Sequence, residues 1–87
     1  MQIIDDLVAD GRLGEAVDKL TRMIGAAPGD ASLLFKRGKI LWRMGKHSAA
    51  MGDYAHAAEL DPSSPAVQAL EQARDIADFF NPDLYNP

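Results

Sequence analysis

Apolar residues recur every three or four positions along most of this 87-residue chain. The clearest runs are Ala16, Leu20, Met23 and Ala27 in one segment and Ala50, Tyr54, Ala57 and Leu60 in a later one. This spacing places apolar side chains on one face of an α-helix, and no stretch shows the strict alternation of a β-strand. We predict five amphipathic helices, at residues 2–10, 13–26, 31–44, 47–60 and 65–79.

Residues at the predicted boundaries support these limits. Pro28 and Pro62 cannot continue a helix, so they mark where the second and fourth helices end. Asp30 is a suitable N-cap for the third helix. Ser64 followed by Pro65 predicts the start of the last helix, with proline at the first helical position.

Two segments of the chain, GRLGEAVDKLTRMIGAAP and GKHSAAMGDYAHAAELDP, align without gaps. The matching pairs are Gly11 with Gly45, Ala16 with Ala50, Leu20 with Tyr54, Met23 with Ala57 and Pro28 with Pro62. All five pairs share one step of 34 residues, which indicates a repeated helical hairpin.

The repeat resembles the tetratricopeptide repeat family, whose unit is a helical hairpin of the same length. In the complete copy, from Ala31 to Ser64, the signature positions of the family are held by Leu34, Gly38, Leu41, Ala50, Tyr54 and Pro62. Arg37 departs from the leucine that the family pattern expects.

The resemblance implies an all-α fold of antiparallel helical hairpins, with about two repeats followed by a C-terminal capping helix. We expect one tetratricopeptide-like domain at residues 1–80 and a short apolar, proline-containing tail at 81–87.

The third predicted helix sorts its residues into stripes at helical spacing. One stripe is predicted to face the partner helix of the hairpin, with glycine permitting a close approach, and it consists of Leu34, Gly38, Leu41 and Gly45. A second stripe is predicted to pack between the repeats, and it consists of Leu33, Arg37, Ile40 and Met44.

The third stripe of this helix combines aromatic and basic residues, namely Phe35, Lys39, Trp42 and Arg43. The resemblance implies that the first helix of each hairpin lines a concave groove. Aromatic anchors beside positive charge suit an acidic or carboxylate-ended peptide. We therefore predict a protein–protein interaction scaffold, with the alternative that the aromatic residues belong to the core and the lysine is merely solvated. A clamp of the kind that holds a C-terminal carboxylate is not expected, because Asp5 stands where such members of the family carry asparagine.

The basic residues also raise a second function. Five of the nine lie between residues 36 and 46, where there is no acid, and they are Lys36, Arg37, Lys39, Arg43 and Lys46. A nucleic-acid contact through this patch is the alternative. The formal net charge of −4 and the lack of a docking motif make nucleic acid the less favoured partner.

Catalytic motifs are weak in this sequence. Gly38, Gly45 and Lys46 superficially resemble a phosphate-binding loop, but six residues separate the glycines where such a loop has four. His47 and His56 are too far apart to share one helical turn as metal ligands. We predict no catalytic, metal-binding or cofactor-binding residue, and therefore no enzyme.

Cysteine is absent, so the chain forms neither a disulfide nor a thiolate metal site, which suits a reducing compartment. The first residues include two aspartates and lack the pattern of a secretion signal, and no apolar run is long enough to cross a membrane. We therefore expect a cytoplasmic protein without a membrane partner.

Stacked helical repeats generally need about three units to bury a continuous core, and the sequence contains barely two and a cap. The end of the chain carries four large apolar residues, which are Phe79, Phe80, Leu84 and Tyr85. These residues raise the hypothesis that the tail docks. It either folds back onto its own repeats or binds in the groove of a second copy, and the second case gives self-association as a homo-oligomer. A frayed terminus remains the alternative.

Overall fold

The computed structural model describes residues 2–80 of the chain, with side chains for residues 3–76. It contains the helices α1 (Gln2–Ala9), α2 (Leu13–Ala26), α3 (Ala31–Arg43), α4 (His47–Leu60) and α5 (Ala66–Phe80). Residues 2–80 include no β-strand, so the all-α fold of helical hairpins expected from the sequence is confirmed. None of the helices in this part of the chain has both the length and the apolar character needed to cross a membrane.

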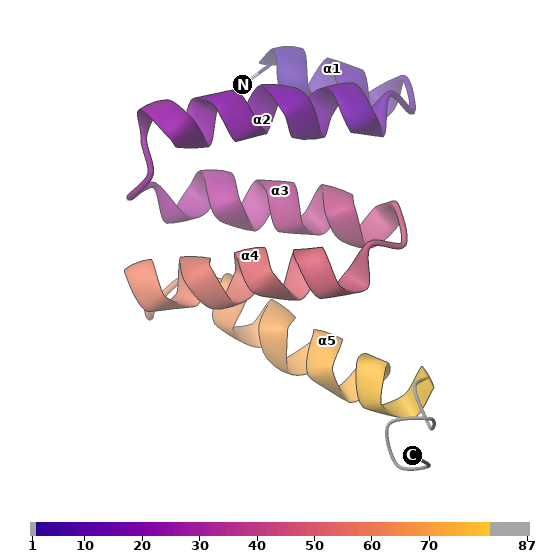
Figure 1. The fold of residues 1–87 in the computed structure, drawn as a ribbon, viewed down its shortest axis with the longest axis vertical. Helices are drawn as coiled ribbons and strands as arrows, with labels where there is room; N and C mark the ends of the chain where they lie inside the picture. Colours follow the sequence, from indigo (N-terminus) through magenta and orange to yellow (C-terminus); the bar gives the residue numbers. More distant parts are fainter. Residues whose placement is uncertain (1, 81–87) are drawn as a thin grey trace.

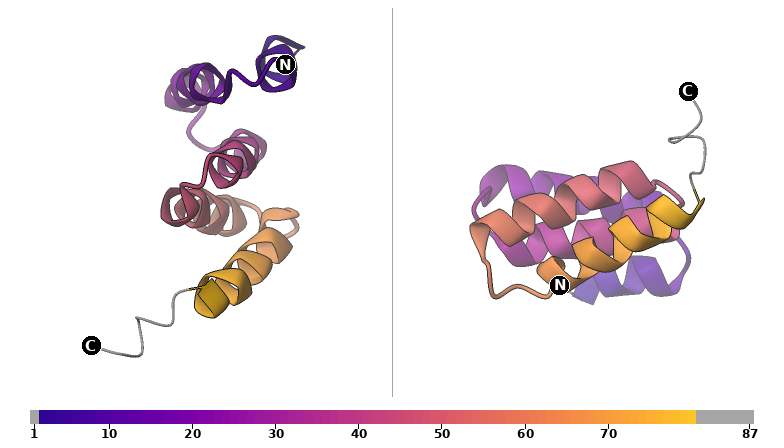
Figure 2. Two further views of the ribbon diagram at one scale, coloured as in Figure 1. Left: turned by 90° about the vertical axis from the view of Figure 1, so that its right-hand side faces the viewer. Right: turned by 90° about the horizontal axis from the view of Figure 1, so that it is seen from below.

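Each helix packs mainly against the next one along the chain, which gives a zigzag stack (Figure 1). Seen along the helices, α1 and α3 lie on one side of the stack and α2 and α4 on the other, while α5 starts on the side of α1 and α3 and slants across beneath α4 (Figure 2). We call the first side the α1–α3–α5 face. The central helix α3 therefore packs between α2 and α4 and still has one side turned to this face.

The two hairpin corners have the same backbone geometry. Gly11 and Gly45 have φ angles of 77° and 80°, in the left-handed region that glycine adopts without a steric cost. At each corner the glycine N–H donates to the carbonyl three residues back, and the following N–H donates to the carbonyl five residues back. These paired bonds satisfy carbonyl groups that the helix end leaves free. Gly45-Lys46 is thus a turn between helices, and Gly38 lies inside α3 and not in a phosphate-binding loop.

The starts of α3 and α5 are also equivalent. The Asp30 carboxylate accepts hydrogen bonds from the backbone N–H of Ser32 at 3.0 Å and from its hydroxyl at 2.6 Å. One repeat later, the Ser64 hydroxyl oxygen accepts from the N–H of Ala66 at 3.1 Å. Both predicted caps are confirmed, although α5 begins one residue after the predicted Pro65.

Two apolar clusters make up the core. The first joins α1 and α2 to one side of α3 through Ile4, Ala16, Leu20, Leu33 and Ile40. The second joins α3, α4 and α5 through Leu34, Leu41, Ala50, Tyr54, Ala57, Ala66 and Ala73. Helix α3 contributes to both, as its predicted stripes require.

Helices α3 and α4 approach most closely at Gly38. A β-carbon at this position would lie 2.7 Å from Cε1 of Tyr54 and 3.3 Å from the carbonyl oxygen of Ala50. The Tyr54 ring is buried and fills the space that a side chain would need. The predicted role of Gly38, to allow a close approach, is confirmed.

Arg37 and Asp53 form a two-point ion pair between α3 and α4. Nε and Nη2 of Arg37 each lie 2.7 Å from one oxygen of the Asp53 carboxylate. The third nitrogen, Nη1, donates to the hydroxyl of Thr21 on α2 at 3.2 Å. The carboxylate raises the pKa of Arg37 above its ordinary value, mainly through the hydrogen bond. Arg37 was predicted to pack between the repeats, but its main partner belongs to its own hairpin.

Helix α5 has the character of a cap. The positions one repeat after Leu34, Gly38 and Leu41 are Gln68, Gln72 and Asp75. All three of these polar residues are exposed. The side of α5 that corresponds to the hairpin contact of α3 is therefore suited to water and not to a further packed helix.

We expect Gly38→Ala to destabilise the fold by about 1–2 kcal/mol, because the strain of overpacking exceeds the gain of about 1 kcal/mol in helix propensity. The matched control is Gly52→Ala in α4, where an added β-carbon has no neighbour within 4 Å. This control should raise stability by up to about 1 kcal/mol. Chemical denaturation followed by circular dichroism measures both, and equal stabilisation by the two variants would refute the close contact.

We expect Asp53→Asn to lower the free energy of unfolding by about 1–3 kcal/mol, because the guanidinium of Arg37 loses a charged acceptor where water only partly replaces it. The side chains of Arg37 and Asp53 are only 21% and 10% exposed. Asp18→Asn on the exposed face of α2 removes the same charge and should change stability by less than about 0.5 kcal/mol. Thermal unfolding of the two variants tests this, and equal midpoints would contradict it.

Two exposed carboxylates in turns, those of Asp30 and Asp61, make the folding stability depend on pH in the acidic range. The hydroxyl of Ser32 holds the pKa of Asp30 below its ordinary value of 3.8, and the hydroxyl of Ser63 does the same for Asp61. A lowered folded-state pKa gives stability that is present above the unfolded value and is lost as pH falls through the folded value.

We therefore expect the wild type to lose stability below about pH 4 more steeply than Asp30→Ser/Asp61→Ser, because serine keeps the turn bonds but does not titrate. Urea midpoints measured from neutral pH downward follow the difference between the two proteins. A difference that stays constant over this range would show that these carboxylates do not couple stability to pH.

Candidate functional site

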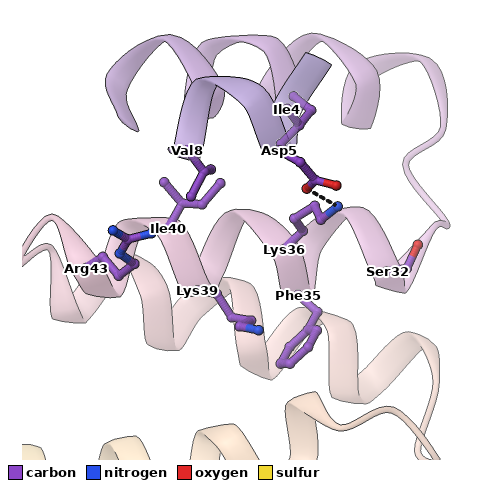
Figure 3. Close-up of a pocket in the computed structure, with 9 residues that line it drawn as sticks. All are labelled: Ile4, Asp5, Val8, Ser32, Phe35, Lys36, Lys39, Ile40 and Arg43. Carbon is purple, nitrogen blue, oxygen red and sulfur yellow. Dashed lines mark hydrogen bonds and ion pairs between the residues drawn. The ribbon is translucent and has the colours of Figure 1, made fainter. Parts of the chain in front are cut away.

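A groove lies between α1 and α3 on the α1–α3–α5 face, with a volume of about 400 Å³ (Figure 3). It exists because α1 packs on α2, and α2 packs on α3, which leaves α1 and α3 facing each other across a gap. Its apolar residues are Ile4, Val8, Phe35 and Ile40, and its polar residues are Asp5, Ser32, Lys36, Lys39 and Arg43. We call it the α1–α3 groove.

Lys36 and Asp5 meet across the groove, with 3.3 Å between Nζ and the nearer carboxylate oxygen (Figure 3). The side chains are 34% and 68% exposed, so water screens the pair and it contributes at most about 1 kcal/mol. Within residues 3–76, no carboxylate pairs with Lys39 or Arg43. The groove therefore carries three cations and one anion, and two of the cations remain available to a ligand.

Phe35 joins the groove to the core. Its ring lies 5.8 Å from the ring of Tyr54, tilted by 45°, and the ammonium of Lys39 lies 5.5 Å from the centre of the Phe35 ring. Burial, followed by the charge of Asp53, raises the pKa of Tyr54 above its ordinary value. The Tyr54 ring thus supports Phe35, which lines the groove.

Trp42, unlike the other three residues of the predicted stripe, does not line the α1–α3 groove. Its ring stacks on His47, with 4.1 Å between the ring centres and an angle of 28°. It also lines a smaller hollow of about 140 Å³ next to α5, together with Ala73 and Ile76. Phe35, Lys39 and Arg43 share the α1–α3 groove, whereas Trp42 lines the hollow next to α5.

The groove also contains residues that the sequence analysis did not assign to it. Asp5 was noted only as a mismatch with a family pattern, and Lys36 only as part of a basic patch. They come together although 31 positions separate them, and no local spacing connects them. The one sequence feature that could have placed Asp5 and Lys36 on the same face is the repeat, because it makes the first and third helices equivalent.

The proposed basic patch is divided by the fold. Arg37 points to Asp53 and Thr21 on the other side of α3, and Lys36 is paired with Asp5. A nucleic-acid contact thus has fewer available cations here than the sequence indicated.

Among residues 3–76 no group of three or more metal-ligating side chains is gathered in one place. Asp53 is bound by Arg37, and His47 is stacked on Trp42.

The predicted self-association residues fall at or beyond the limit of the described structure. Phe79 and Phe80 belong to the last turn of α5, but their side chains are outside the described set. Leu84 and Tyr85 lie outside the described residues altogether, as does the predicted tail at 81–87. Docking of the tail remains a prediction.

A search of solved structures finds a similar chain, the Bacteroides fragilis protein BF1650, whose solution NMR structure was determined as a target of the Northeast Structural Genomics Consortium. The two chains are 31% identical and superpose with a TM-score of 0.84. The match covers 98% of the present chain and 87% of the other. A scan against protein-family models and a search of curated proteins find no match.

Proposed function

We propose that this chain, which belongs to the same family as the Bacteroides fragilis protein BF1650, is a protein-interaction scaffold that binds a short carboxylate-bearing segment of another protein in the α1–α3 groove. The observation that carries the proposal is the pairing of an apolar floor with two cations, Lys39 and Arg43, that have no carboxylate partner among the described residues. No catalytic step is part of it.

The size and lining of the groove fit this role. Its volume of about 400 Å³ is within the usual range of ligand pockets, and it suits one or two side chains of a partner segment. Phe35 provides a rigid apolar contact, and Arg43 can bind a carboxylate with two parallel hydrogen bonds. Aromatic and arginine side chains dominate the binding energy of many interfaces.

The repeat geometry supports a tetratricopeptide-like scaffold as part of the proposal. The left-handed glycines, their paired backbone bonds and the capping bonds of α3 and α5 all recur at a step of 34 residues. Stacked hairpins of this kind expose the side formed by their first helices, which here carries the α1–α3 groove. The cytoplasmic setting expected from the cysteine-free sequence belongs to the same proposal.

Short fluorescent peptides that combine apolar and acidic residues test this function. Arg43→Ala and Lys39→Ala should each weaken binding by about three- to tenfold, because each removes a charged contact of roughly 1 kcal/mol. Lys46→Ala is the matched control, since Lys46 is an exposed cation at the α3–α4 corner and does not line the groove.

Fluorescence anisotropy measures the dissociation constants for all three variants. Equal weakening by Lys46→Ala would show that general positive charge and not the groove attracts the ligand. If single-stranded nucleic acid bound more tightly than any peptide, with a steep dependence on salt, the alternative function would replace this one.

A further inference from the structure

The charges of the α1–α3 groove are arranged unequally along its length. Ser32 and the Asp5–Lys36 pair lie toward the start of α3, and Arg43 lies at its opposite end (Figure 3). Lys36 is neutralised by its partner, while Lys39 and Arg43 have no carboxylate against them in the described part of the chain. The positive character of the groove is therefore concentrated toward the end of α3.

The Asp5 carboxylate can accept more hydrogen bonds than the described residues donate to it. Its carboxylate accepts one hydrogen bond among the described residues, from Lys36, and its side chain is 68% exposed. An ionised carboxylate has about four acceptor sites, so most of those on Asp5 remain available to a ligand in the groove. A cation or N–H of the ligand is attracted there, and a second carboxylate is repelled.

The N-terminus of α3 does not reverse this preference. Helix N-termini attract anions through their free N–H groups and the helix dipole. Here the Asp30 carboxylate already caps that end and accepts from Ser32. The start of α3 thus has its own anion, and together with Asp5 it disfavours another.

We infer that Asp5 makes the α1–α3 groove selective for a bipolar segment, which carries a carboxylate at one end and a cation or hydrogen-bond donor at the other. The inference rests on the proposed function. The carboxylate of the segment binds Lys39 and Arg43, its apolar side chain covers Phe35 and Ile40, and its positive or donating end lies at Asp5. Asp5 is thereby a specificity-determining residue, and the partner is not simply an acidic chain.

Three labelled peptides of equal length and equal apolar content test the inference. The bipolar peptide has a lysine before the apolar residues and a glutamate after them, the singly acidic peptide replaces the lysine with glutamine, and the doubly acidic peptide replaces it with glutamate. If net charge alone decided affinity, the doubly acidic peptide would bind most tightly to a groove with three cations.

We expect the wild type to bind the bipolar peptide about two- to fivefold more tightly than the doubly acidic one, which is the range for exposed charge pairs. Asp5→Asn should abolish or reverse this order, because it removes the repulsion and releases Lys36. The matched control is Asp6→Asn, which changes net charge equally at an exposed position outside the groove and should keep the wild-type order.

Circular dichroism establishes that each variant is folded, and Asp5→Asn should change the unfolding midpoint only slightly because its ion pair is exposed. Tighter binding of the doubly acidic peptide by the wild type, or equal effects of the two asparagine variants, would overturn the role of Asp5. Failure of the proposed function is a separate result, since Arg43→Ala would then leave the affinity for all three peptides unchanged.

Discussion

The simultaneous packing of α3 against α2 and α4 is the constraint on which the rest of the structure depends. Its contact with α4 has no room for a side chain at Gly38, where the buried ring of Tyr54 occupies the space. On its other side, Leu33 and Ile40 pack against the first hairpin. A larger residue at position 38 would push the hairpin apart and disturb both clusters, because α3 contributes to each of them.

The groove follows from the same constraint. With two sides of α3 buried, its third side faces the gap to α1, and no other helix within residues 2–80 covers that gap. The residues exposed there are mixed in character, since Phe35 is supported by Tyr54 while Lys39 and Arg43 extend toward water. A surface of this kind has both apolar area and directional charge, which together allow affinity and selectivity.

Neighbouring cations on α3 have different roles because of where the helix turn places them. Arg37 is engaged by Asp53 and Thr21 and joins α2, α3 and α4 in one network. Lys36, one residue earlier, crosses the groove to Asp5. A run that reads as one basic patch is thus divided between structural stability and the binding surface, and only position around the helix separates the two roles.

Much of the fold was determined by local features of the sequence. Gly11 and Gly45, the prolines and the cap at Asp30 act within a few residues of themselves, so their effects on the chain could be predicted from the spacing alone. The role of Gly38 was also predictable, because the apolar stripe on either side of it identifies the hairpin contact. The tertiary structure alone decided that Asp5 meets Lys36, that Arg37 pairs with Asp53, and that Trp42 lines the hollow next to α5 and not the α1–α3 groove. Each of these depends on how far one helix is rotated and shifted against another, and that arrangement results from the packing of many side chains whose combined effect no short stretch of sequence contains.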